Sequence, residues 1–351
     1  MATNTYMLEY DAFIRSIKQN KNVSHAVLLG AGASISSQIQ SAADCIWEWK
    51  RDIYSSNNPN TTLIVSNFRS EAVRRSIQAW LDAQGKYPLM GSSDEYSFYA
   101  EKAYPIEADR QKYFEQLAYN KAPYIGYKLL CMLNNAGIVK SVWTTNFDGL
   151  TERAAHQMNI TPICITLDDP ERIFRNENSH ELLYIALHGD YKYSKLKNTN
   201  QELDTQNNIF KDALKRYFVD KNLIVMGYSG RDKSLMNALK EAFSQPGSGR
   251  LYWCGFGDDI CSEVKDLIDI ARVNNRIAYF ISTDGFDKTI LQLSRACFED
   301  DIVKQEEIKK LIKSTIKKDE TKTSFRIESP RDDKFVKSNL HPGFSERCIS
   351  I

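Results

Sequence analysis

The sequence predicts an α/β fold in which helices cover both faces of a mostly parallel sheet. Short apolar runs recur along the chain and are separated by helix-like segments, an alternation typical of parallel sheets. Several runs end directly in a glycine-rich or polar segment, as buried strands do at their carboxyl ends. With 351 residues, the chain can form one large core and a small accessory segment. The predicted fold is therefore Rossmann-like, with a helical insert.

The N-terminal part of the chain contains the first strand signal. Residues 11–19 have apolar positions at helical spacing, which predicts a short amphipathic helix. Residues 26–29 form an unbroken apolar run, typical of a strand that is buried on both faces. The run ends in the glycine turn of residues 30–34, and we expect a helix to follow through Cys45 and Trp49.

A largely helical insert is predicted at about residues 56–135, with residues 113–133 as its last long helices. Beyond the insert, residues 150–157 are predicted to form a helix. Six further apolar runs are predicted as strands: residues 138–144, 162–166, 182–187, 222–226, 251–254 and 276–280. Residues 304–323 are rich in Lys and Glu and read as a helix within a C-terminal tail.

Composition and charge argue against several classes of partner. Lys and Arg number 46 against 45 for Asp and Glu, a net charge of +1 that gives no electrostatic case for nucleic acid or a membrane. The seven cysteines are scattered without the spacing of a zinc ligand set, so no metal site is predicted. No signal peptide and no run of about 18 apolar residues occurs. We expect a soluble, cytoplasmic protein with reduced thiols.

Polar residues that directly follow apolar runs are the candidates for a ligand site, because ligands of open parallel sheets bind at the carboxyl edge. The first group is the turn with Gly30, Ala31, Gly32 and Ser34. Glycines there let a backbone approach a pyrophosphate, and the following helix offers free amides. A tight turn without a ligand is the alternative.

Three further groups follow later runs. In the segment with Thr145, Asn146 and Asp148, the amide and the carboxylate suit ribose hydroxyls, although either could instead cap the next helix. His188 can take a proton near neutral pH, although an isolated histidine is more often a packed or surface residue. The last group could contact a nucleotide or simply start a helix; it consists of Gly227, Ser229 and Asp232, with Gly255 after the next run as a weaker candidate.

The order of these motifs resembles one family. GAGAS, TTNFD, LHGD and a Gly-Tyr-Ser segment, each after a strand-like run, are similar to motifs of the sirtuin superfamily, and specifically of its bacterial defence-associated NAD-hydrolase branch. The resemblance covers about residues 24–298. The segment CIWEWKRDIY and the helical stretch ahead of TTNFD also resemble sirtuin-like proteins that work with short prokaryotic Argonautes or HerA-type ATPases.

The resemblance implies a role for each candidate. Asn146 would contact the nicotinamide ribose and help to place the attacking water, His188 would act as general base, and Asp148 would support the same pocket. The expected nucleotide contacts are Gly30, Ala31, Gly32 and Ser34 at the phosphates and nearby ribose, Gly227, Ser229, Asp232 and Gly255 at the adenosine half, and Thr145 in the same binding set.

Two departures from the family shift the expected activity. Residues 191–222 contain no cysteine, so the zinc ribbon of deacylase sirtuins is not expected. Ala42 and Ala43 stand where the deacylase loop has Phe and Arg, which removes two parts of the pocket that shield the reactive sugar from water. The sequence therefore predicts an NAD hydrolase that releases nicotinamide and ADP-ribose and requires no metal.

The hypothesis extends to a cellular role. Residues 1–300 would form the NAD-binding catalytic domain of an effector that depletes NAD in anti-phage defence, and residues 301–351 would form a tail available for interaction. Regulation by a homo-oligomer or by an Argonaute-like or HerA-like activating partner is expected. The alternatives are an NAD-dependent protein deacylase and a non-catalytic module that binds NAD or ADP-ribose for signalling. A Rossmann dehydrogenase is disfavoured because the first turn lacks the third spaced glycine.

Overall fold

The computed structural model confirms the predicted α/β fold. It describes residues 5–59, 67, 69–92, 94–166, 170–175, 178, 180–187 and 208–324. The chain divides into two compact units, Met1–Lys309 and Lys310–Ile351, while the domain boundary at residue 300 and the limits of the insert stay predictions. The predicted C-terminal helix is confirmed as α14 (Ile302–Ser324). Within the described ranges, no helix is long and apolar enough to cross a membrane.

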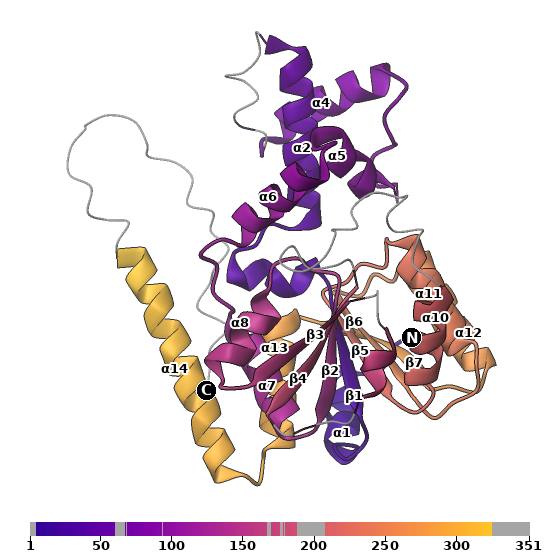
Figure 1. Ribbon diagram of the computed structural model, residues 1–351, viewed down its shortest axis with the longest axis vertical. Coiled ribbons are helices and arrows are strands. Elements are labelled where there is room, and N and C mark those ends of the chain that lie inside the picture. The colour runs from indigo at the N-terminus through magenta and orange to yellow at the C-terminus, as the bar shows by residue number, and fades with distance from the viewer. Residues whose placement is uncertain are drawn as a thin grey trace. The chain divides into compact units, whose positions relative to one another are not determined.

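The first unit contains a seven-stranded sheet in which neighbouring strands are parallel (Figure 1). The strand order is β3-β4-β2-β1-β5-β6-β7. From β1 the strands β5, β6 and β7 follow outward on one side, whereas on the other side the chain passes from β2 to the edge strand β3 and returns to β4 between them. The predicted strands are confirmed as β1 (His25–Leu29), β2 (Val139–Thr144), β3 (Thr161–Thr166), β4 (Glu181–Ala186), β5 (Asn222–Met226), β6 (Leu251–Phe256) and β7 (Ala278–Thr283).

The three central strands end level with one another. Leu29 of β1 pairs with Thr144 of β2 on one side and with Met226 of β5 on the other. The residues that follow these three positions therefore leave the sheet side by side, at the topological switch point where ligands bind in such folds. β1 and β5 are buried at every position, as expected for a sheet covered on both faces.

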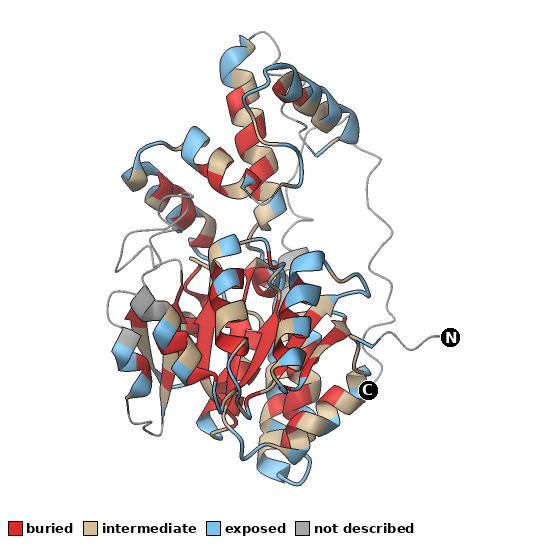
Figure 2. Ribbon diagram, turned by 90° about the vertical axis from the view of Figure 1, so that its right-hand side faces the viewer, coloured by how far each residue is buried: buried red, intermediate tan, exposed pale blue. Residues whose placement is uncertain are grey.

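Helices cover both faces of this sheet, and Figure 2 shows the buried strands enclosed between them. α10, α11 and α12 share a hydrophobic core with one face, which includes Trp143 and Val225. α7 packs against β2, α8 against β3, and α13 against α7 and α1. Their bounds are α1 (Tyr10–Gln19), α7 (Ile125–Asn135), α8 (Leu150–Gln157), α10 (Asn208–Tyr217), α11 (Lys233–Phe243), α12 (Ser262–Val273) and α13 (Phe286–Cys297).

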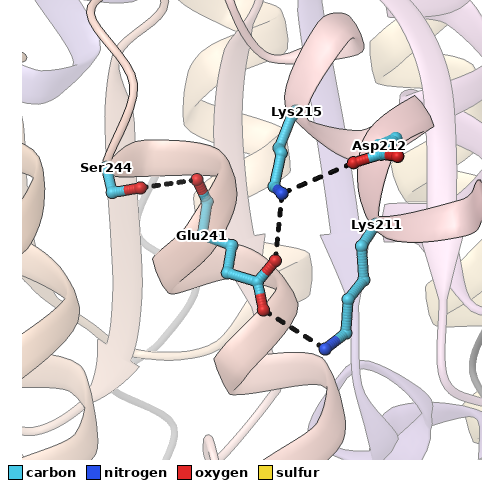
Figure 3. Close-up of polar contacts among 5 residues, drawn as sticks. All are labelled: Lys211, Asp212, Lys215, Glu241 and Ser244. Carbon is cyan, nitrogen blue, oxygen red and sulfur yellow. Dashed lines mark hydrogen bonds and ion pairs between the residues drawn. The ribbon is translucent and has the colours of Figure 1, made fainter. Parts of the chain in front are cut away.

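Ion pairs join α10 to α11 (Figure 3). The carboxylate of Glu241 lies 3.2 Å from the ammonium of Lys211 and 3.1 Å from that of Lys215. Partial burial raises the pKa of Glu241, but hydrogen bonds from the two lysines outweigh burial and leave this pKa below its usual value. Because α11 directly follows the β5 loop, these pairs help to hold the helix that starts at the centre of the sheet edge.

A second group of helices forms a separate aromatic core, which we call the helical roof. Its members are α2 (Ala42–Asn57), α4 (Glu71–Ala83), α5 (Glu95–Ala103) and α6 (Glu107–Ala118). Trp49, Tyr99 and Phe114 are buried at its centre. The roof thus includes α2, which lies mostly ahead of the predicted insert, whereas α7 at the end of that insert packs against the sheet.

The roof also contains a buried ion pair between α2 and α5. The ammonium of Lys50 is fully buried and contacts the carboxylate of Glu95, which is itself buried. Lys50 donates a further hydrogen bond to Oε1 of Gln78 at 2.8 Å and lies 5.0 Å from the ring centre of Tyr99. A second oxygen of Glu95 accepts from the backbone N–H of Gly91 at 2.8 Å. The buried charges are therefore paired and hydrogen-bonded, as burial requires.

Candidate active site

A cavity of about 620 Å³ lies between the carboxyl edge of the sheet and the helical roof. This volume falls within the range of about 300–1,000 Å³ that is usual for ligand pockets. The loops after β1, β2 and β5 form its floor, as the positions of the predicted motifs require. The floor residues include Ala31, Gly32, Ser34, Thr145, Asn146, Asp148, Gly227, Ser229 and Asp232. The structure therefore brings together most of the sequence-predicted site residues.

The two glycine turns of the floor pack directly against each other. The N–H of Gly30 donates to the carbonyl of Met226 at 3.0 Å, and the N–H of Gly32 donates to the carbonyl of Gly227 at 2.8 Å. Gly227 has a φ of +66°, and a Cβ there would collide with the backbone of Ala33. Backbone-to-backbone approach, rather than approach to a phosphate alone, thus explains these glycines. The N–H of Gly32 is also already used within the protein.

A buried hydrogen-bonded cluster lies beneath the cavity. Oγ of Ser34, which is fully buried, donates to Oδ2 of Asp148 at 2.5 Å, and the N–H of Leu150 donates to Oδ1 of the same carboxylate at 2.9 Å. Burial raises the pKa of Asp148, while these two hydrogen bonds and the charge of Arg153 oppose the rise. Asp148 therefore satisfies the first-turn amide of α8 and lines the cavity at the same time.

Asn146 connects the β2 loop to the β1 loop. Its Nδ2 donates to the carbonyl of Gly30 at 2.9 Å and to Oγ of Ser34 at 3.1 Å. Its backbone N–H donates to Oγ1 of Thr144 at 3.0 Å. The first-turn amide of α8, that of Leu150, donates to Asp148 and not to Asn146. The amide is oriented by its partners, because the Gly30 carbonyl accepts hydrogen bonds but cannot donate them.

The loop after β5 leads into a helix, which agrees with the sequence interpretation that this segment starts a helix. Oδ1 of Asp232 accepts from the backbone N–H of Ser234 at 2.8 Å and of Leu235 at 3.2 Å, which caps α11. Asp232 and Ser229 nevertheless line the cavity. The capping role and a ligand contact are therefore compatible at this position.

Three predicted residues need separate mention. Gly30 does not line this cavity, and a Cβ there would collide with the backbone of Gly227. Gly255 does not line this cavity; it lies within β6, where a Cβ would meet the ring of Phe280, so strand packing explains that glycine. His188 lies outside the described residues. β4, which precedes it, ends at Ala186 in register with Thr144 of β2, and the N–H of Leu187 donates to the Thr144 carbonyl at 2.8 Å.

The roof supplies cavity residues that the sequence analysis did not select. Ile46 of α2, Tyr96 of α5 and Phe114 of α6 line the cavity, and Phe147 lines it from within the TTNFD motif. The rings of Phe114 and Phe147 lie 4.9 Å apart. Phe147 stands between Asn146 and Asp148, which were both selected and which both line the cavity. This position in the motif is the local signal that could have revealed Phe147. The other three face the cavity only because the roof folds over the sheet edge.

A further unselected residue is Tyr127 of α7. Its hydroxyl lies 2.8 Å from Oγ of Ser34, and its side chain is buried. Cys45 also lines the cavity, but burial raises the pKa of its thiol to about 12, which leaves it protonated and unreactive at neutral pH. Among the described residues, no group of three or more His, Cys, Asp or Glu side chains is placed to hold a metal ion.

A parallel α/β sheet with a cavity at its switch point defines the class of protein, a ligand-binding fold of the Rossmann-like kind. Comparison with known families is more specific. Residues 140–275 match the family model described as SIR2-like domain, which supports a sirtuin-like family and fits NAD-dependent activity in general. The match includes the β2 and β5 loops of the cavity floor but not the first glycine turn. No curated protein matches the chain.

Proposed function

We propose that this chain hydrolyses NAD to nicotinamide and ADP-ribose. The observation that carries the proposal is the cluster of Ser34, Asn146 and Asp148 in the floor of a large cavity, within a chain whose residues 140–275 match a SIR2-like domain. The cavity combines polar groups, concentrated in the floor, with apolar and aromatic groups, most of them in the roof, which suits a ligand with a charged, hydroxylated part and flat rings.

In the proposed reaction, the bond between the ribose anomeric carbon and the nicotinamide nitrogen breaks. The electron pair of this bond moves onto the nicotinamide nitrogen and neutralises its positive charge. The oxygen of one water bonds to the anomeric carbon, and the water releases one proton. The protein's contribution is therefore to position the ribose, stabilise the developing positive charge on the sugar and admit a single water.

The floor residues have distinct proposed tasks. Asn146 contacts the nicotinamide ribose and the attacking water, and the Asp148 carboxylate stabilises the positive charge that develops on the sugar. His188 accepts the proton released by the water, a role proposed from the family resemblance alone. The proposed nucleotide contacts that line the cavity are Ala31, Gly32, Ser34, Thr145, Gly227, Ser229 and Asp232.

The first turn of α2 supports hydrolysis over deacylation. Ala42 and Ala43 line the cavity at the start of this helix. Their methyl groups leave open the space that larger side chains would fill, so water can approach the sugar. The inert Cys45 thiol beside them offers no competing protein nucleophile.

We further propose that the activity depletes cellular NAD in anti-phage defence and is held in check until assembly with copies of this chain or with an Argonaute-like or HerA-like partner. This part of the proposal is supported by the motif resemblance described above. Nicotinamide release should therefore be measured for the purified full chain alone and with candidate partners of both kinds.

Replacement of Asn146 by Ala is expected to lower nicotinamide release by about 100-fold or more, because a preorganised group at the reacting sugar is lost. Asn274→Ala is the matched control, since this half-buried asparagine caps the C-terminal end of α12 and its side-chain amide donates to the Ile270 carbonyl of that helix. Undiminished release by the Asn146 variant would overturn the proposal. Turnover of an acetyl-lysine peptide would favour a deacylase, and nucleotide binding without nicotinamide release would favour the signalling module.

A further inference from the structure

Tyr127 is a buried residue of α7 that touches the floor cluster from behind. Its side chain is 1% exposed, and its ring packs edge-on against Phe286 of α13 at a centroid distance of 5.1 Å. The preceding residue, Gly126, donates its N–H to Oδ1 of Asp287 at 2.7 Å. α7 is therefore fixed against α13 at this point, and the Tyr127 hydroxyl has a defined position.

The hydroxyl of Ser34 has three partners, which fixes the direction of every bond. A hydroxyl group has one proton to donate and two lone pairs that accept. The Ser34 proton goes to the carboxylate of Asp148, and one lone pair accepts from Nδ2 of Asn146. The remaining lone pair faces the Tyr127 hydroxyl at 2.8 Å. Tyr127 must therefore be the donor in this bond.

This arrangement determines which end of the Asn146 amide faces the cavity. Its Nδ2 donates to Ser34 and to the Gly30 carbonyl. A flipped amide would turn Oδ1 toward these two partners, and neither has a proton to donate to it, because the Ser34 proton goes to Asp148. Oδ1 is thus left as the acceptor that Asn146 presents to a ligand. An acceptor at this place suits the hydroxyl of a ribose or the proton of an attacking water.

We propose that Tyr127 is a positioning residue that fixes the orientation of Asn146 through Ser34, and so aims the amide oxygen at the sugar and water of the reaction. The inference rests on the proposed NAD hydrolysis for its effect on turnover, and on the described hydrogen bonds for its effect on Asn146. Without the tyrosine hydroxyl, Ser34 keeps its bond to Asp148 but loses its third partner. Its hold on Nδ2 of Asn146 is then weaker, and the bond to the Gly30 carbonyl is left to hold the amide.

The test is Tyr127→Phe, which removes one oxygen and keeps the ring. We expect kcat for nicotinamide release to fall about tenfold or more, as misorientation of a reacting group does, with KM within twofold of the wild-type value. In a Ser34→Ala background, Tyr127→Phe should lower kcat much less than in the wild type, because the bond to Ser34 is already absent and only the direct interaction of Tyr127 with the Asn146 amide is left. Additive losses in the two variants would overturn the proposal.

Tyr217→Phe is a matched control. The Tyr217 hydroxyl is also buried and also bonds a serine hydroxyl, that of Ser141, at 2.8 Å, but Ser141, unlike Ser34, does not line the cavity. The Tyr217→Phe substitution removes an equivalent hydrogen bond from the core and is expected to leave kcat unchanged. A similar fall in both variants would mean that Tyr127 only stabilises the fold, and the proposal would fail.

A spectroscopic readout separates this inference from the proposed function. With 15N-labelled asparagine, the side-chain amide signals of Asn146, identified by their loss in Asn146→Asp, should shift or broaden in Tyr127→Phe and stay in place in Tyr217→Phe. Wild-type protein that releases no nicotinamide, alone or with partners, would overturn the proposed function while this shift still supports the role of Tyr127. Unchanged Asn146 signals in Tyr127→Phe would overturn the inference whatever the turnover.

Discussion

The floor and the roof of the cavity are built in different ways. In the floor, strand register sets the backbone, and hydrogen bonds among Ser34, Asn146 and Asp148 set the side chains. In the roof, aromatic side chains pack around a buried ion pair between Lys50 and Glu95. The floor side chains are held by hydrogen bonds between neighbouring strand-end loops, whereas the roof depends on two buried charges that stabilise each other only as a pair.

The largest expected effect is on the roof. Lys50→Met leaves the Glu95 carboxylate buried without its cation, which is expected to destabilise the protein by about 3–5 kcal/mol. Replacing both residues, as Lys50→Met with Glu95→Leu, should recover most of this loss. Urea unfolding followed by tryptophan fluorescence reports on the roof through Trp47, Trp49 and Trp80 and on the sheet core through Trp143 and Trp253. Equal losses in the single and double variants would show that the roof does not depend on charge pairing.

The next effect concerns the end of the sheet opposite the cavity. His25, at the start of β1, is fully buried, and burial lowers the pKa of its imidazole to about 4. Between pH 6.5 and about 4, the unfolded chain binds a proton at this residue and the folded chain does not. The contribution of the neutral imidazole is therefore complete above pH 6.5 and is lost as the pH falls, by about 3 kcal/mol over the window.

His25→Gln should flatten this part of the stability profile, measured by urea unfolding at a series of pH values. His156→Gln, at an exposed position on α8, is the control. Subtracting the profiles cancels the titration of groups common to both proteins. If the free energy of unfolding of the His25 variant falls with decreasing pH as steeply as that of the wild type, His25 is not the source of this pH dependence.

The smallest effect is expected at the ion pairs between α10 and α11, which have the same chemistry as the roof pair but lie at the surface. The Glu241 side chain is 42% exposed, and exposed pairs contribute about 1 kcal/mol or less. Glu241→Gln should therefore lower the free energy of unfolding only slightly, and less at high salt. A loss comparable with that of Lys50→Met would show that burial is not what separates the two sites.

The floor could be predicted from the sequence because its signals are local. Each of its loops follows an apolar strand directly, and parallel strands place such loops at one edge of the sheet. Asn146 and Asp148 were found in this way, and the structure places both in the cavity floor. Gly255 has the same local signal but lies within β6 and does not line the cavity. A glycine is needed at this position because a Cβ would meet the ring of Phe280.

The roof and Tyr127 could not be predicted by the same route. Their contribution depends on contacts between residues far apart in the chain, such as Phe114 with Phe147 or Tyr127 with Ser34. Helical periodicity indicates which side chains are buried but not what they are buried against. The predicted insert was therefore located as helical without any sign that α2 belongs to the same aromatic core.

The interlocked glycine turns have a consequence for engineering this protein. The backbones of the Gly30–Gly32 turn and the Gly227 turn are hydrogen-bonded to each other. Neither loop can therefore be lengthened or exchanged on its own, and neither tolerates a larger residue in place of its glycines. A library that varies one turn while holding the other at its native sequence should yield mostly insoluble variants. Functional diversification of this cavity is better directed at the roof, where side chains rather than main chain meet the ligand space.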